Sequence, residues 1–320
     1  VLRGESPSSR MYPIDMMEML LGQGRALRDT AANPDAGGMP MSHGHSGGGG
    51  WPMPPMPAGL TMLPALMELD APDVTPFLPS VADPSAVPYA RPRELARLAN
   101  GDTLALEATY VRRRLRGDDH IMYGFNGQIP GPLIQVDEAS TITVEFTNSI
   151  DWPTTVHWHG IRLDNASDGV PGITQDPVEP GASFTYTIRF DDPGIYWYHP
   201  HHREDILKDL GLSGNLRVEP ERAGYYAPVN REEVVMLDDI LMNGSEPVPF
   251  GAERANDALM GRFGDLLLVN GEPSYDLEVA RGEVVRFFLT NVSNTRTFNV
   301  SFAGAPMKVV GADIGLYERE

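Results

Sequence analysis

The sequence predicts an all-β protein made of two Greek-key β-sandwiches in tandem, preceded by an irregular extension. Short runs of β-branched and aromatic residues recur along residues 88–320, and Pro, Gly, Asn and Asp separate them at the spacing of sandwich strands. The 320 residues include 33 glycines and 29 prolines, which suits a fold with many turns. Hydrophobic residues make up 41% of the chain, which is enough to form real cores.

Residues 1–87 are predicted to form the extension, which is rich in Met, Gly and Pro. Ten of the fifteen methionines lie here, and the Pro and Gly content excludes a regular helix or sheet over residues 39–57. Thioether and imidazole groups together suit Cu(I). The candidate accessory copper ligands are Met39, Met41, His43 and His45. A tail that wraps the surface, with Met as adaptable apolar filler, explains the same residues without copper.

Residues 88–222 are predicted to form the first sandwich. Its expected strands are residues 104–110, 133–136, 142–147, 154–158, 183–190 and 194–199. Residues 203–210 have helical character.

Residues 223–320 are predicted to form a second sandwich that stops before its last strands. Its expected strands are residues 233–237, 265–269, 277–279, 283–290, 297–302 and 307–310. A compact domain that ends at Glu320 is the alternative.

Two His-x-His tripeptides, His157-Trp158-His159 and His199-Pro200-His201, hold half of the eight histidines. Side chains alternate along a strand, so residues i and i+2 point the same way, about 6–7 Å apart. If the two strands are neighbours, four imidazoles converge on a patch wide enough for more than one metal ion. Neutral imidazoles without a thiolate or carboxylate cluster suit Zn, Cu, Fe or Ni. A structural role is the alternative for either pair taken alone.

The remaining composition limits the partners. A net charge of −19 disfavours nucleic acid and anionic membranes, although an acidic surface also serves solubility. No stretch of 18 apolar residues is present, so no membrane-spanning helix is predicted. The aromatic residues around the histidines, Trp158, Tyr196, Trp197 and Tyr198, are predicted to be core residues that keep the strands rigid.

Several motifs in residues 124–220 resemble the first cupredoxin domain of multicopper oxidases, the laccase family. They are Phe125-Asn126-Gly127-Gln128-Ile129-Pro130-Gly131-Pro132, His157-Trp158-His159-Gly160, Tyr196-Trp197-Tyr198-His199-Pro200-His201 and Gly211-Leu212-Ser213-Gly214. A weaker resemblance continues through residues 268–271 and 291–294 into a second domain. The first 85 or so residues are outside it.

The resemblance implies a trinuclear copper cluster, which reduces O2 to water with four electrons taken from a phenolic or metal-ion substrate. By position in the motifs, His157 resembles the ligand of the type 2 copper. His159, His199 and His201 resemble ligands of the two type 3 coppers. Asp168 resembles the family's acidic residue near the type 2 copper, which orients water and passes protons; a plain Asp-Gly turn is the alternative reading.

The resemblance also implies that part of the enzyme is missing from this chain. Residues 297–302 contain no histidine, as in the copper-free middle domain of three-domain enzymes. Domain 3 would carry the type 1 copper, whose cysteine ligand this chain lacks. We therefore expect the C-terminal remainder to accompany it as a separate chain, and O2 and a small reductant to be the other partners. The family implies a periplasmic or secreted protein, and the absence of the cysteine pairs typical of fungal secreted laccases favours a bacterial one.

Two other functions are compatible with the sequence. A copper-resistance cuprous oxidase would use the Met-rich arm. A non-catalytic cupredoxin-fold scaffold is less consistent with four retained histidines. The sequence does not identify the reductant.

Overall fold

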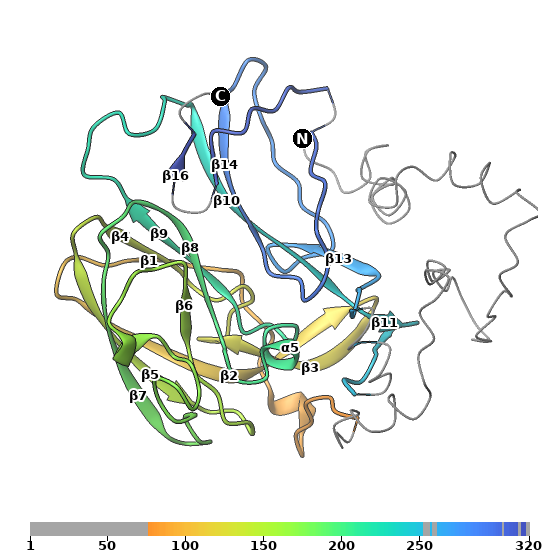
Figure 1. Ribbon diagram of the computed structural model, residues 1–320. Helices are drawn as coiled ribbons and strands as arrows, with labels where there is room; N and C mark the ends of the chain where they lie inside the picture. The colour runs from red at the N-terminus through yellow and green to blue at the C-terminus, as the bar shows by residue number, and fades with distance from the viewer. Residues whose placement is uncertain (1–75, 252–256, 258–260, 303, 313–314, 318–320) are drawn as a thin grey trace, which may run out of the picture. The chain divides into compact units, whose positions relative to one another are not determined.

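The computed structural model describes residues 76–251, 257, 261–302, 304–312 and 315–317 (Figure 1). Regular structure in these residues is almost entirely β, which confirms the predicted fold class. The helical elements described are η1 (Pro84–Ala86), η2 (Asn165–Ser167) and α5 (Glu204–Leu207). The candidate ligands Met39, Met41, His43 and His45 lie outside the described residues.

Two sheets form the first sandwich. The first sheet has the order β3-β2-β5-β7, and its strands are β2 (Thr103–Leu115), β3 (Asp118–Phe125), β5 (Thr141–Asn148) and β7 (Ser183–Arg189). The second has the order β1-β4-β9-β8-β6, and its strands are β1 (Leu95–Arg97), β4 (Leu133–Asp137), β6 (His157–His159), β8 (Gly194–His199) and β9 (Gly214–Glu219). Strands distant in the sequence pair in parallel, β2 with β5 and β4 with β9, because the chain crosses between sheets as a Greek key does.

The inward faces of both sheets form one hydrophobic core. Burial alternates along β5, where Ile142, Val144 and Phe146 point inward, and Trp158 and Tyr198 of the second sheet are also fully buried. Buried aromatic hydroxyls need partners. The Tyr198 hydroxyl donates a 2.7 Å hydrogen bond to the carbonyl of Pro132, so the ring is fixed at both ends.

The first sandwich differs from prediction in several places, and strands β1 and β9 were not predicted at all. Strand β3 was not predicted, because it begins with two exposed aspartates and its apolar pattern starts late. It forms because Arg116 and Gly117 both have positive φ and make a two-residue hairpin with β2. Strand β6 has three residues, fewer than expected, and the predicted helix of residues 203–210 is the single turn α5.

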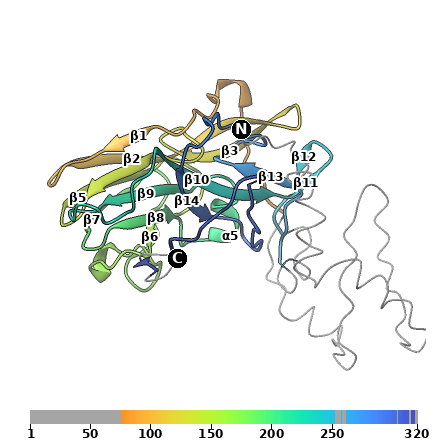
Figure 2. The same ribbon diagram turned by 90° about the horizontal axis from the view of Figure 1, so that it is seen from above.

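Strand β10 is the centre of a three-stranded sheet in the order β13-β10-β14. Its members are β10 (Arg231–Ile240), β13 (Leu266–Val269) and β14 (Val285–Asn291). Two hairpins accompany it, β11 (Met242–Asn243) with β12 (Glu246–Pro247), and β15 (Gly311–Ala312) with β16 (Gly315–Leu316). Hairpin β11–β12 lies beside β3 (Figure 2), where Arg116 donates to the carbonyl of Gly244.

Three strands predicted in this second part are wrong. Residues 277–279, 297–302 and 307–310 form no strand in the structure. Each has apolar residues at strand spacing, but a strand also needs a neighbour to receive its backbone hydrogen bonds. None of these segments pairs with another described strand.

Polar contacts join residues 88–222 to residues 223–320. Asn215 of β9 donates a 2.7 Å hydrogen bond to Thr290 Oγ1 of β14, and Arg93 donates to the carbonyl of Val234 in β10. Near α5, Arg262 lies 3.5 Å from the carboxylate of Asp209.

The buried Arg296–Asp239 ion pair should be important for stability. The guanidinium Nε lies 2.7 Å from the carboxylate, and the two side chains are only 3% and 1% exposed. Arg296→Leu should lower the free energy of unfolding by about 3–5 kcal/mol, because it leaves an uncompensated buried charge. Arg162→Leu, which breaks an exposed pair with Asp192, should change it by less than about 1 kcal/mol. Urea unfolding of both variants tests this, and equal losses would contradict it.

Candidate metal centre

Antiparallel pairing of β6 with β8 brings the histidines together. In this register His157 lies opposite His199, and His159 lies opposite Trp197. The two His-x-His segments are therefore neighbours, which is the condition for their imidazoles to converge. Gly169 has a positive φ, and a Cβ there would lie 2.0 Å from the carbonyl oxygen of Val156, so only glycine lets the Asp168 segment approach β6 this closely.

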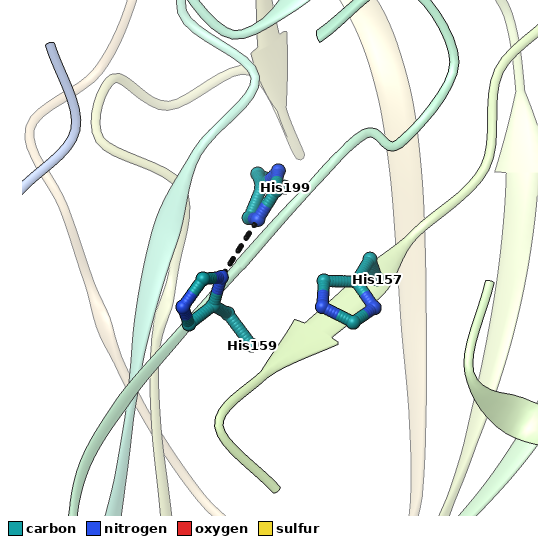
Figure 3. Close-up of side chains that lie close together, drawn as sticks. All are labelled: His157, His159 and His199. Carbon is teal, nitrogen blue, oxygen red and sulfur yellow. Dashed lines mark hydrogen bonds between the residues drawn. The ribbon is translucent and has the colours of Figure 1, made fainter. Parts of the chain in front are cut away.

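Three imidazoles form one group. Each of His157, His159 and His199 offers a nitrogen, and these nitrogens all lie within 4.8 Å of one another (Figure 3). His199 Nε2 and His159 Nδ1 are 3.4 Å apart. Two nitrogens bound to one tetrahedral ion at about 2.0–2.1 Å would be separated by roughly 3.3 Å. The spacing of this pair therefore fits a single shared metal ion.

Backbone carbonyls orient the rings of His157 and His199. His157 Nδ1 lies 2.7 Å from the carbonyl oxygen of Asp168, and His199 Nδ1 lies 2.8 Å from that of Pro200. A carbonyl only accepts, so Nδ1 is the protonated nitrogen of each neutral ring. Nε2 of each ring then keeps a free lone pair for a metal.

Acidic side chains lie close behind the same nitrogens. Asp168 Oδ1 is 3.4 Å from His157 Nδ1, and Glu204 Oε2 is 3.8 Å from His199 Nδ1. Asp168 thus reaches His157 through both its carbonyl and its carboxylate. Such acceptors fix the ring orientation of ligand histidines and increase their basicity.

His201 lies beside the group but outside it. It follows the end of β8, it is exposed, and its ring centroid is 5.2 Å from that of His157 and 6.4 Å from that of His199. Its backbone NH donates to the hydroxyl of Thr155. His202 is partly exposed and joins no metal-type group among the described residues.

Trp197 differs from the prediction that it is a core residue. Trp158, Tyr196 and Tyr198 are buried, but Trp197 is partly exposed. Its ring stacks on His199 with centroids 4.0 Å apart and contacts His159 at 4.7 Å. Strand alternation contains this signal, since residues 197 and 199 share a face.

Burial keeps His199 neutral. It lowers the pKa of His199 to about 3, the Pro200 carbonyl opposes this shift, and the nearby His157, Lys208 and His159 add to it. A neutral imidazole is the form that binds metal. Three imidazoles without thiolate or carboxylate in the group suit copper or zinc, so these residues fit a copper ion.

Comparisons with known proteins indicate the family. Two family profiles, both described as multicopper oxidase, match residues 107–223 and 197–318. The multicopper oxidase MmcO of Mycobacterium tuberculosis is 30% identical over 251 residues, which is 69% of this chain and 49% of that protein. Copper resistance protein A of Pseudomonas syringae is 39% identical over 117 residues, 36% of this chain and 18% of that protein.

Solved structures give the same result. A multicopper oxidase from Pseudomonas thermotolerans has a TM-score of 0.57 at 33% identity, covering 63% of this chain and 49% of that one. Lac15 from a marine microbial metagenome has a TM-score of 0.56 at 35% identity, covering 68% of this chain and 55% of that one.

Fold and site together define a cupredoxin-like protein with a histidine cluster that could hold a metal ion. The chain belongs to the multicopper oxidase family. It spans between 18% and 49% of the length of the curated relatives compared. Among the described residues, no helix is long and apolar enough to cross a membrane.

The metal-free chain should lose stability on acidification through His199. The unfolded chain takes up a proton near pH 6.5, but the folded one does so only near pH 3. The contribution of His199 to the free energy of unfolding is therefore fully present above pH 6.5. It is lost as the pH falls toward 3, by up to about 1.4 kcal/mol per pH unit. Burial raises the pKa of Asp209 and Asp238, so these two carboxyl groups make the free energy of unfolding rise, and not fall, on acidification.

A difference measurement therefore isolates His199. Urea unfolding of the wild type and of His199→Gln between pH 7 and pH 4 should show a shallower decline for the variant. Parallel curves would contradict the assignment.

Proposed function

We propose that this chain supplies half of the trinuclear copper cluster of a laccase-like oxidase. The observation that carries this proposal is the group of three imidazoles at the paired strands β6 and β8, two of whose nitrogens lie 3.4 Å apart. Bound copper would supply one-electron steps that together reduce O2 to water. The reductant would be a phenol or a metal ion.

The four histidines take the roles their motifs suggest. His157 is proposed to hold the type 2 copper, and His159, His199 and His201 are proposed to hold the two type 3 coppers. The facing nitrogens of His159 and His199 support a shared ion for this pair. The ring of His201, 5.2 Å from that of His157, supports its place at the edge of the same cluster.

Asp168 is proposed to hold His157 and to pass protons. Its carbonyl accepts from His157 Nδ1 at 2.7 Å, which fixes the ring. Its carboxylate is 3.4 Å from the same nitrogen, and the side chain is 32% exposed. A carboxylate that contacts both a ligand and solvent can exchange protons between them.

The rest of the enzyme is proposed to lie in a C-terminal remainder, present as a separate chain. This chain has no cysteine and cannot build a type 1 copper site. Residues 1–87 are proposed to be an extension, residues 88–222 the first cupredoxin domain, and residues 223–320 part of the second. The family resemblance supports a periplasmic or secreted location.

Copper binding tests the cluster assignment. His157→Ala and His199→Ala should each weaken Cu(II) binding by the chain at least about tenfold, because each removes a ligand imidazole. His202→Gln is the matched control, since it changes an adjacent histidine outside the group, and it should bind as the wild type does. Chelator competition followed by electron paramagnetic resonance measures this. Equal affinity in all four proteins would refute the site.

The role of Asp168 is tested in the enzyme assembled with its C-terminal remainder. Asp168→Asn should retain copper but consume O2 about 10- to 100-fold more slowly, because the proton carrier is lost. Asp176→Asn, an exposed acid in the same loop, is the control and should leave the rate unchanged. Unchanged O2 consumption in Asp168→Asn would reject the role.

A second candidate is a cuprous oxidase that serves copper resistance. The methionines of residues 1–87 and the similarity to copper resistance protein A favour it. Deleting residues 1–60 should then reduce Cu(I) oxidation by the assembled enzyme several-fold and spare phenol oxidation. Equal loss of both activities, or of neither, would contradict a copper-specific arm.

A further inference from the structure

Trp197 touches two of the three clustered histidines. It precedes His199 by two residues on β8 and is the cross-strand partner of His159 on β6. Its ring centroid lies 4.0 Å from that of His199, with the planes 20° apart, and 4.7 Å from that of His159, with the planes 32° apart. One indole therefore contacts both rings whose nitrogens face each other at 3.4 Å.

A buried cation contacts the same indole. Lys208 follows α5, is 7% exposed, and has its Nζ 5.7 Å from the centre of the Trp197 ring. Lysine is almost never this buried unless it is paired. A cation over an indole face is attracted by the ring quadrupole, more strongly when water is excluded. Lys208 can therefore help to hold the plane of the indole.

We propose that Trp197 is a positioning residue, which sets the ring planes of His159 and His199 for metal, and that Lys208 holds Trp197 in place. This inference rests on the proposed copper site. Carbonyls orient His157 and His199 through Nδ1, and the exposed ring of His159 sits at the end of a three-residue strand. A stacked indole restricts rotation of such a ring, and ligand sites need their rings fixed by a surrounding layer of contacts.

Removing the charge of Lys208 separates two explanations of how this residue affects metal binding. Its positive charge acts on His199. If charge repulsion were its only effect, removing the charge would strengthen the binding of a metal cation. If Lys208 positions Trp197, removing the charge should weaken metal binding instead. Lys208→Met keeps most of the side-chain length and removes the cation, so the direction of the change decides between these explanations.

The test is Cu(II) affinity of the 320-residue chain, measured by chelator competition, with the hyperfine pattern in electron paramagnetic resonance as a second readout. Trp197→Leu should bind about 10- to 100-fold more weakly with a changed hyperfine pattern, as expected when a contact that orients a ligand is lost. Trp197→Phe retains an aromatic face and should lie closer to wild type. Lys208→Met should bind several-fold more weakly, with little further effect in the Trp197→Leu background.

Tyr196→Phe is the matched control. It changes the adjacent aromatic residue, whose side chain is on the other face of β8 and donates to the carbonyl of Asp192. It should bind Cu(II) as the wild type does. Thermal melts of each variant check folding, and the Phe and Met variants decide the question if Trp197→Leu is unfolded.

The outcomes separate this inference from the proposed function. Wild-type affinity in Trp197→Leu, equal losses in the Leu and Phe variants, or tighter binding by Lys208→Met would overturn the positioning role. A wild type that binds no Cu(II), or a His199→Ala variant that binds normally, would overturn the copper site and this inference with it.

Discussion

The pairing register of β6 and β8 is the constraint on which the site depends. Side chains alternate along both strands, so a slip of one residue would turn the histidines into the core and Trp158 out to solvent. Burial opposes such a slip, since Trp158 is fully buried in the core of the sandwich. The hydrophobic effect that stabilises the sandwich therefore also sets which nitrogens meet at its edge. No histidine has to contribute to stability for the cluster to form.

The segments before and after β6 reinforce this register from outside the ladder. Thr154 bridges to Val178, and the backbone NH of Val156 donates to the Tyr186 hydroxyl of the opposite sheet. Gly169 then allows the chain to return close enough for the Asp168 carbonyl to reach His157. The three-residue strand β6 is thus held by contacts of the residues before it, by its pairing with β8, and by the Asp168 carbonyl that His157 contacts. Rigidity at the ligands comes from the scaffold, as precise metal sites require.

The sequence predicted the first sandwich far better than the second part of the chain. Residues 194–199 form a strand with the predicted bounds, and the fold class is confirmed, because alternation and turn residues report directly on a half-buried strand. Residues 297–302 have a similar pattern but no paired neighbour, and pattern alone does not supply one. In the site, His157, His159 and His199 meet, whereas His201 lies beyond the end of β8 where alternation no longer applies. The contact of Trp197 with His159 depends on cross-strand pairing, which no single segment encodes.

The two facing nitrogens belong to different positions on their rings. Nε2 of His199 is at the far end of its imidazole, and Nδ1 of His159 is at the near end, next to the main chain. A point midway between them is therefore closer to the backbone of β6 than to that of β8. The site is therefore asymmetric, because the facing nitrogen of His199 lies further along its side chain than that of His159. Exchanging the sequences of β6 and β8 would not reproduce this asymmetric arrangement, even though each strand would still present a histidine to the site.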